Sequence, residues 1–313
     1  MRRIVSVSIG SSQRDSKAVV TVCGEKFSIE RIGTDGDMQK AVALIRELDG
    51  KVAAFGMGGI DLYLQGGTRR YILREAKQIA RAAQITPIVD GSGLKNTLER
   101  RAIQTLAQQN PSLFQGRNVL LTCALDRFGM AQALQETGSS VLYGDVMFAL
   151  GLSLPIYRLK VLQWVVTILA PIAVQMPFAW LYPTGTKQEK SPDQNKYAKY
   201  YAWADVIAGD YHMIRRYMPE DLTGKTLITN TITPGDVEFL KRRNVRELIT
   251  TTPNIEGRSF GTNVMEALLV ALLNKPLADI TPEDYNRMLD KIGFMPRREV
   301  LDDAFSVQPQ MGT

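Results

Sequence analysis

The chain has 313 residues, of which 45% are hydrophobic and 22% charged, a composition typical of a soluble globular protein with two domains. The net charge of +6 comes from basic residues scattered along the chain, which argues against a nucleic-acid groove. Two distant cysteines and a single histidine, His212, argue against a metal site or a Ser-His-Asp triad, so we expect no metal.

The N-terminal third alternates strand and helix patterns. Alternating or continuous apolar residues predict strands, and an apolar spacing of three to four residues predicts a helix. The predicted strands cover residues 4–9, 18–23, 27–32 and 51–55, and the predicted helix covers Met38–Leu48. No secretory signal precedes the first strand, so the expected location is cytoplasmic.

The glycine-rich loop Gly56–Asp61 follows the last of these strands. Such a loop either allows a ligand to approach the backbone closely, with Asp61 facing it, or allows tight backbone packing, and the sequence leaves both open. A helix is then predicted over 68–84, a short strand over Ile88-Val89, a turn that starts at Asp90, and a helix over 94–108.

The stretch 118–145 predicts a strand, a turn, a helix and a second strand that ends at Asp145. This is the outline of one half of a dinucleotide-binding domain. If Gly129 is the last glycine of the phosphate-binding fingerprint, Ala124 and Asp126 occupy the two earlier glycine positions. Asp145 would accept hydrogen bonds from the adenosine ribose, which favours NAD over NADP.

An unusually apolar segment follows, and residues 161–182 contain no charged side chain. Three interpretations stay open: a helical hairpin buried against the fold, a transmembrane helix, or a segment that contacts a membrane surface or a partner. We expect a peripheral contact of this kind within residues 155–183.

Regular α/β patterns resume after a polar linker, and the chain closes with two helices. The predicted strands cover 204–208, 225–229 and 247–251, and the predicted helices cover 211–218, 234–243, 262–273 and 282–292. Residues 306–313 are predicted to form a tail.

Three stretches together resemble the shikimate/quinate 5-dehydrogenase family, of which the chain would be a divergent member. They are VDGSGLKNTLERR at 89–101, NVLLTCALDRFGMAQAL at 118–134 and ADVIAGD at 204–210. The family aspartate beside the substrate hydroxyl corresponds to Asp90. The family lysine is absent after the strand at 51–55, and Lys95, one helical turn after Asp90, is the residue that could replace it.

The resemblance implies an NAD(P)-dependent oxidoreductase that transfers hydride at a hydroxyl or keto carbon of a small molecule other than shikimate. Asp90, Lys95 and Asp61 would form the catalytic group, and Ser11, Ser12 and Asn96 would contact the substrate. NAD or NADP would lie against the turn after residue 121 and the strand end near 208, and the residues implied there are Ala124, Leu125, Asp126, Arg127, Phe128, Gly129, Asp145, Ala208 and Gly209.

The expected fold is a two-domain α/β chain. Residues 1–112 would form an α/β substrate domain, and 113–261 a Rossmann-like nucleotide-binding domain with an apolar helical insert at about 146–200. Residues 262–305 would return as helices to the first domain. A homodimer fits this organisation. The alternative function is a non-catalytic nucleotide-binding sensor or assembly protein that docks a partner or membrane through the insert.

Overall fold

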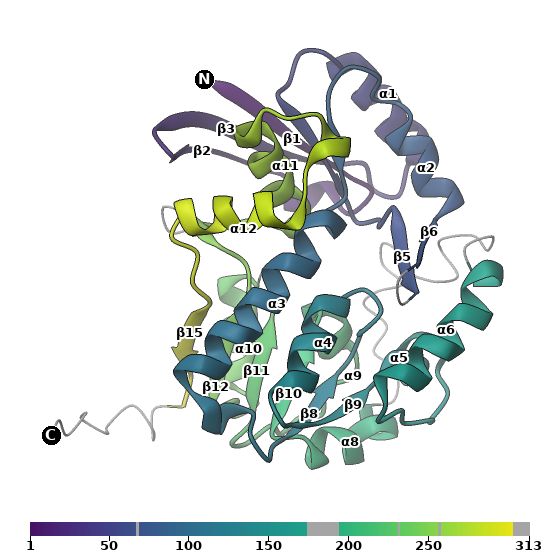
Figure 1. Cartoon of the computed structure of the whole chain (residues 1–313), viewed down its shortest axis with the longest axis vertical. Coiled ribbons are helices and arrows are strands. Elements are labelled where there is room, and N and C mark those ends of the chain that lie inside the picture. The colour runs from purple at the N-terminus through teal and green to yellow at the C-terminus, as the bar shows by residue number, and fades with distance from the viewer. Residues whose placement is uncertain (67–68, 174–193, 231, 256–257, 303–313) are drawn as a thin grey trace, which may run out of the picture.

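The computed structural model describes residues 1–66, 69–173, 194–230, 232–255 and 258–302. Figure 1 shows two lobes, each a sheet with helices on both faces, with the long helix α3 running from one lobe to the other. The expectation of a two-domain α/β chain is therefore confirmed at the level of a two-lobe α/β fold.

The N-terminal lobe contains a five-stranded sheet in the order β2-β3-β1-β4-β7, in which only β2 is antiparallel to its neighbour. Its strands are β1 (Arg2–Ser8), β2 (Ser16–Val22), β3 (Glu25–Gly33), β4 (Ala54–Gly58) and β7 (Ile88–Val89). The helices of this lobe are α1 (Met38–Leu48), α2 (Arg74–Ala80), α11 (Thr262–Leu273) and α12 (Pro282–Lys291).

Both faces of this sheet are buried, because β1 sends alternate side chains to opposite sides. Val5 and Val7 join the core under α1 and α2, and Ile4 joins the core under α11 and α12. Ser6 is buried on the α11 side, where its Oγ accepts a hydrogen bond of 2.8 Å from Asn263 Nδ2. The polar residue Ser6 in the alternating pattern of β1 therefore makes a buried contact between the sheet and α11.

The C-terminal lobe contains a six-stranded sheet in the order β15-β12-β11-β10-β8-β9, parallel except for β15. Its strands are β8 (Asn118–Leu121), β9 (Ser140–Tyr143), β10 (Val206–Gly209), β11 (Thr226–Thr229), β12 (Glu247–Thr250) and β15 (Arg297–Val300). The five parallel strands, numbered along the chain, have the order 2-1-3-4-5. This differs from the 3-2-1-4-5-6 order of the dinucleotide-binding Rossmann fold.

Helices cover both faces of the second sheet as well. They are α3 (Ser92–Gln109), α4 (Phe128–Glu136), α5 (Asp145–Leu150), α6 (Leu159–Ala173), α8 (Ala198–Trp203), α9 (Tyr211–Tyr217) and α10 (Pro234–Lys241). One apolar core lies under α3, α4 and α6, and another under α8, α9 and α10. Short 3-10 helices occur at Ser12–Arg14, Pro111–Leu113, Gln194–Tyr197 and Leu277–Asp279.

One predicted element is wrong. In place of a helix over 68–84, the chain forms the hairpin β5 (Tyr63–Gly66) and β6 (Arg69–Ile72), and α2 begins only at Arg74. Tyr71 and Ile72 have side chains that favour strands, and pairing with β5 satisfies the backbone of this segment. A second hairpin, β13 (Asn254–Ile255) and β14 (Arg258–Ser259), was not predicted either.

The apolar segment after Asp145 forms α5 and α6 as far as the structure describes it. Residues 174–193, which would hold the second arm of the predicted hairpin, lie outside the described residues, as do residues 303–313 with the predicted tail. Within the described part of the chain, no helix combines the length and the apolar character needed to cross a bilayer.

Candidate functional site

The carboxyl ends of the parallel strands carry the charged residues of the candidate site. Asp61 follows β4, Asp126 and Arg127 follow β8, and Asp210 follows β10. In open α/β sheets, ligands bind outside the carboxyl ends of strands, at the point where the strand order reverses. In the C-terminal lobe that point lies between β8 and β10.

Helix α3 connects these strand ends across the two lobes. Its buried residues Lys95 and Glu99 are four positions apart and therefore lie on the same face. We call the charged group that meets here the inter-lobe cluster, and it consists of Asp61, Lys95, Glu99, Asp126, Arg127 and Asp210.

Lys95 joins a carboxylate from each lobe. Its Nζ lies 2.6 Å from Oδ1 of Asp126 and 3.4 Å from Oδ1 of Asp61. Burial by itself would lower the pKa of Lys95, but the charges of Asp126 and Asp61 outweigh burial and raise this pKa above its ordinary value. Lys95 is therefore a permanent cation between two acids.

Asp61, the acid that the N-terminal lobe contributes to this bridge, has a pKa near neutrality. Burial raises the pKa of Asp61 to about 7, Lys95 opposes that shift, and the charges of Asp126 and Asp90 add to it. Perturbed pKa values of this kind are concentrated at functional sites, although structural ion pairs produce them too.

Arg127 forms the second bridge, and only 1% of its surface is exposed. Its Nη1 pairs with Glu99 of α3, and its Nη2 lies 3.1 Å from Oδ2 of Asp210. Burial would raise the pKa of Asp210, but the charges of Arg127, His212 and Lys95 and the hydrogen bond from the Met213 amide together outweigh burial and lower this pKa to about 2. Asn230 Nδ2 donates a further hydrogen bond of 3.0 Å to Asp210.

The exposed part of the inter-lobe cluster is made of carboxylates. The side chains of Asp61, Asp126 and Asp210 are 29%, 21% and 28% exposed, whereas those of Lys95 and Arg127 are 9% and 2% exposed. The cluster therefore offers hydrogen-bond acceptors to solvent and keeps its cations inside.

The predicted catalytic residues come together only in part. Lys95 contacts Asp61, as given above. Asp90 is 7% exposed and fixes the backbone around it: its carboxylate accepts hydrogen bonds from the amides of Leu62, at 2.7 Å, and Ser92, at 3.0 Å, and from Ser92 Oγ, at 2.6 Å. This carboxylate orders the loop after Asp61 and the first turn of α3. Its predicted catalytic role is not tested by these contacts.

The turn predicted to hold a pyrophosphate is closed by a side chain of the protein itself. The Asp145 carboxylate accepts hydrogen bonds from the amides of Ala124, at 3.0 Å, and Leu125, at 2.9 Å. Asp145 is 7% exposed, and burial raises its pKa to about 6 in spite of these two hydrogen bonds. The carboxylate assigned to a ribose therefore satisfies the backbone donors of this turn.

Four further residues assigned to the cofactor, Phe128, Gly129, Ala208 and Gly209, serve packing. The Gly129 amide donates to Asn96 Oδ1 at 2.9 Å, and a Cβ at Gly129 would collide with the Asn96 carbonyl of α3. Phe128 and Ala208 are buried in the apolar core that lies beneath α3, α4 and α6. At Gly209, whose φ is +136°, a Cβ would collide with the Thr122 side chain.

Ser11 and Ser12, assigned to the substrate, belong to another polar network. The Ser12 amide donates to Asp35 at 2.7 Å, and Arg31 Nη1 donates to the Ser11 carbonyl at 3.0 Å and to Asp15 at 2.9 Å. Asn96 is the third residue assigned to the substrate, and its side-chain oxygen accepts the hydrogen bond from the Gly129 amide described above. No contact with the inter-lobe cluster is recorded for the two serines within the described part of the chain.

The glycine-rich loop after β4 packs against backbone and small side chains. A Cβ at Gly56 would lie 3.0 Å from the Asn263 backbone, and one at Gly58 would lie 2.8 Å from Ser8 Cβ. These glycines therefore allow close packing, and Asp61 at the end of the loop is the residue that reaches the candidate site.

Three functional candidates were missed from sequence. Glu99 and Asp210 complete the bridges of Arg127, and Glu266 lies 3% exposed on α11, where its Oε1 accepts a hydrogen bond of 2.8 Å from the Tyr285 hydroxyl. Burial and the charge of Asp90 raise the pKa of Glu266 to about 7. A charged residue inside an otherwise apolar helix pattern was the available signal for Glu266.

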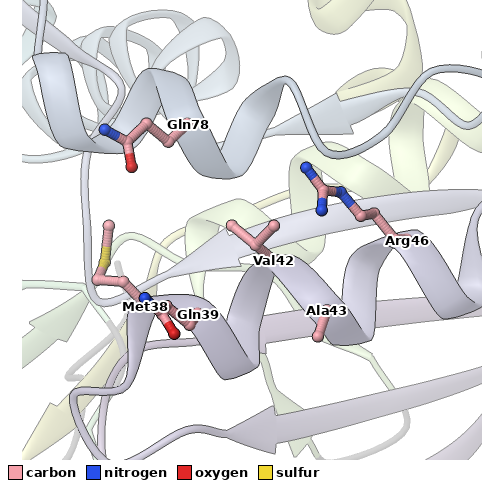
Figure 2. A pocket seen from close by; sticks show the side chains of 6 residues that line it. All are labelled: Met38, Gln39, Val42, Ala43, Arg46 and Gln78. Atoms are coloured by element: carbon pink, nitrogen blue, oxygen red, sulfur yellow. The ribbon is translucent and has the colours of Figure 1, made fainter.

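Two hollows lie away from the inter-lobe cluster. One, between α1 and α2, has a volume of about 530 Å³. Figure 2 shows Met38, Val42 and Gln78 among the residues that line it. The other, of about 300 Å³, is lined by residues from the amino ends of the C-terminal strands, among them Arg117 and Arg246. Among the described residues, no group of three or more His, Cys, Asp or Glu side chains could hold a metal ion.

Comparison with solved structures returns sugar-binding proteins. AraP, an arabinose binding protein from Geobacillus stearothermophilus, is 11% identical with a TM-score of 0.42, and the match covers 98% of this chain and 99% of that chain. GanP, a glucose-galactose binding protein from the same organism, is 8% identical with a TM-score of 0.39, and the match covers 96% and 98%. TM-scores below 0.5 carry no argument about what this chain binds.

The resemblance to shikimate/quinate dehydrogenases is corrected by these comparisons. The family models that match the chain describe domains of unknown function, and the strand order of the C-terminal lobe is not that of a Rossmann dehydrogenase. The membership of the shikimate/quinate dehydrogenase family and the NAD(P)-dependent oxidoreductase function are therefore wrong predictions, whereas binding of NAD or NADP remains a prediction.

No curated protein matches the chain. Two family models do. One, described as a domain of unknown function (DUF8753), matches residues 3–90, and the other, described as a domain of unknown function (DUF8754), matches residues 93–301. Because the second model spans more than half of the chain, the protein belongs to the family of the domain of unknown function DUF8754.

Proposed function

We propose that the protein binds a small, uncharged polyhydroxylated molecule at the junction of its two lobes, against the inter-lobe cluster. The observation that carries this proposal is the pattern of exposure: the carboxylates of Asp61, Asp126 and Asp210 are partly exposed, whereas Lys95 and Arg127 are buried. Ionised carboxylates accept hydrogen bonds only, so above pH 7, where Asp61 is ionised too, a matching ligand must bring donors, and hydroxyl groups supply them.

The position of the cluster supports the same proposal. Asp61 comes from the N-terminal lobe and Asp126 from the C-terminal lobe, and Lys95 holds both of them in place. A ligand that donates to both acids would touch both lobes at once. Polar groups that are fixed before the ligand arrives lose little conformational entropy on binding.

The excess of carboxylates excludes phosphorylated ligands. An anion brought within about 4 Å of a carboxylate is repelled by about 4 kcal/mol at the effective dielectric of a protein surface. The two cations that could offset this repulsion, Lys95 and Arg127, are already paired with acids.

A ligand screen by thermal unfolding tests the proposal. The neutral arm contains L-arabinose, D-allose, D-galactose and myo-inositol, and the anionic arm contains D-galactose 1-phosphate. A ligand present at 100 times its dissociation constant stabilises the folded state by about 2.7 kcal/mol, which is readily seen as a higher melting temperature. We expect stabilisation by at least one neutral compound and none by the phosphate.

Two site variants and one control locate the binding. Asp61→Asn and Asp126→Asn each remove one acceptor charge and should abolish the stabilisation by ligand. Asp37→Asn is the control, because Asp37 caps α1 at an exposed position where asparagine caps equally well. Absence of stabilisation by every neutral compound, or equal stabilisation in all three variants, would overturn the proposal.

The predictions of a homodimer, of a cytoplasmic location and of a peripheral contact through residues 155–183 remain predictions. None of them is needed for binding at the inter-lobe cluster, since all six cluster residues come from one chain.

A further inference from the structure

Helix α6 is apolar on two opposite faces. Leu159 and Leu162 are buried in the core of the C-terminal lobe. Val161, Trp164 and Ile168 are 46%, 69% and 51% exposed, and their spacing of three and four places them on one common face. A surface helix ordinarily has a polar outer face, so the outer face of α6 is unusual.

The loop before α6 extends this apolar surface. Leu152, Leu154 and Tyr157 are 55%, 56% and 55% exposed. We call the exposed side chains at positions 152, 154, 157, 161, 164 and 168 the α6 patch. Figure 1 shows α6 along the outer edge of the C-terminal lobe. Exposed apolar surfaces of this kind commonly mark contact sites for proteins or membranes.

The charged residues between positions 146 and 173, the segment that carries the α6 patch, have a single sign. Arg158 and Lys160 are exposed at the start of the helix, and Lys196 Nζ donates to the Gly151 carbonyl at 2.7 Å, beside the loop. The sequence contains no acidic residue from 146 to 173. The rim of the patch is therefore basic and would be attracted to an anionic surface.

This charge pattern distinguishes between possible occupants. In a symmetric dimer the same patch faces itself, so the basic rim of Arg158, Lys160 and Lys196 would face a second basic rim, which disfavours the pairing. Anionic lipid headgroups would neutralise the same three cations. Basic residues near such a membrane strengthen the attraction between the protein and the lipid surface.

We propose that the α6 patch binds the surface of membranes that contain anionic lipid. Helix α6 lies in the plane of the interface, with Ile168 and Val161 in the boundary between headgroups and acyl chains. Trp164 and Tyr157 lie at the level of the headgroups, where amphipathic rings are favoured. Arg158 and Lys160 face the lipid phosphates. This inference does not depend on the ligand proposed for the inter-lobe cluster.

Vesicle flotation of the full chain tests the inference. The vesicles contain phosphatidylcholine alone or a mixture with phosphatidylglycerol. The first variant is the double substitution Trp164→Ser and Ile168→Ser. The second, Arg158→Gln with Lys160→Gln, removes two rim charges. The control, Val19→Ser with Ile85→Ser, removes two apolar side chains that are 54% and 79% exposed in the N-terminal lobe.

We expect the wild type and the control to float with mixed vesicles, and at least tenfold less protein to float with phosphatidylcholine alone. Both α6 variants should lose at least tenfold with mixed vesicles while they keep the melting temperature of the wild type. Failure of the wild type to float, or equal flotation of all variants, would overturn the inference. It would also be overturned if light scattering showed a wild-type dimer that the Trp164 and Ile168 variant lacks, because a second copy would then cover the patch.

Discussion

Lys95 and Asp126 form an ion pair of 2.6 Å between the helix that connects the lobes and the loop after the first strand of the C-terminal sheet. Because the same ammonium group also lies 3.4 Å from Asp61, the pair connects the N-terminal lobe to the C-terminal lobe through one buried cation. Removing that cation should affect both lobes.

Lys95→Met should destabilise the protein by about 3 kcal/mol or more at pH 8, because it leaves Asp61 and Asp126 without their common cation. The loss should be smaller at pH 5, below the Asp61 pKa of about 7, where this carboxyl is protonated. Urea unfolding at both pH values measures the difference. Lys241→Met, which removes an exposed pair with Glu238, should cost less than about 1 kcal/mol at either pH.

Arg127→Met should destabilise the protein by about 3–5 kcal/mol, because Glu99 is then left as a buried carboxylate without a counter-ion. Adding Glu99→Gln should recover part of this loss, and a double-mutant cycle from denaturant unfolding measures the coupling. Strict additivity of the two substitutions would show that the pair is not coupled. Arg117→Met, at an exposed pair of 3.8 Å, is the matched control and should have little effect.

Glu266→Gln should make stability less dependent on pH. Folding raises the pKa of Glu266 to about 7, so the folded state binds its proton more tightly than the unfolded chain does. The resulting stabilisation is fully present below about pH 4, near the ordinary pKa of glutamate, and is lost as the pH rises through 7. Its upper limit is about 3 kcal/mol for a shift of this size. The free energy of unfolding of the variant minus that of the wild type should therefore be larger at pH 8 than at pH 5. An unchanged difference between pH 5 and pH 8 would contradict the pKa shift.

Gly129→Ala should destabilise the protein by about 1–3 kcal/mol, since the new methyl group collides with the Asn96 carbonyl and separates α4 from α3. Gly235→Ala is the control at another helical glycine, where a Cβ would lie 3.9 Å from Thr233 Oγ1 and meet no obstacle. There the higher helix propensity of alanine should leave stability unchanged or slightly raised. Equal melting temperatures for the two variants would show that Gly129 is not a packing contact.

Most of the elements were predictable because their signals are local. The helix Met38–Leu48 and the C-terminal helices have apolar residues at helical spacing, and their starts have capping residues such as Asp37 and Thr281. The β5–β6 hairpin was not predictable in this way. Its residues match a helical pattern about as well, and cross-strand pairing decides the outcome.

The candidate site was predictable in its location and not in its chemistry. The sequence places Asp61 and Asp126 after strands and Lys95 at the start of the connecting helix, and in the structure these three side chains meet at one junction. Which partner each charge takes depends on how the lobes meet. Asp145 is the clearest case, because a carboxylate at the end of a strand matches the pattern for ribose binding and instead satisfies the amides of Ala124 and Leu125.

A crystal structure grown with a saturating neutral polyol from the ligand screen tests the central claim most directly. The account predicts ligand density at the junction of the lobes, with hydroxyl groups within hydrogen-bond distance of the Asp61 and Asp126 carboxylates. Density in the hollow between α1 and α2, beside Val42 and Gln78, with none at the junction, would contradict it.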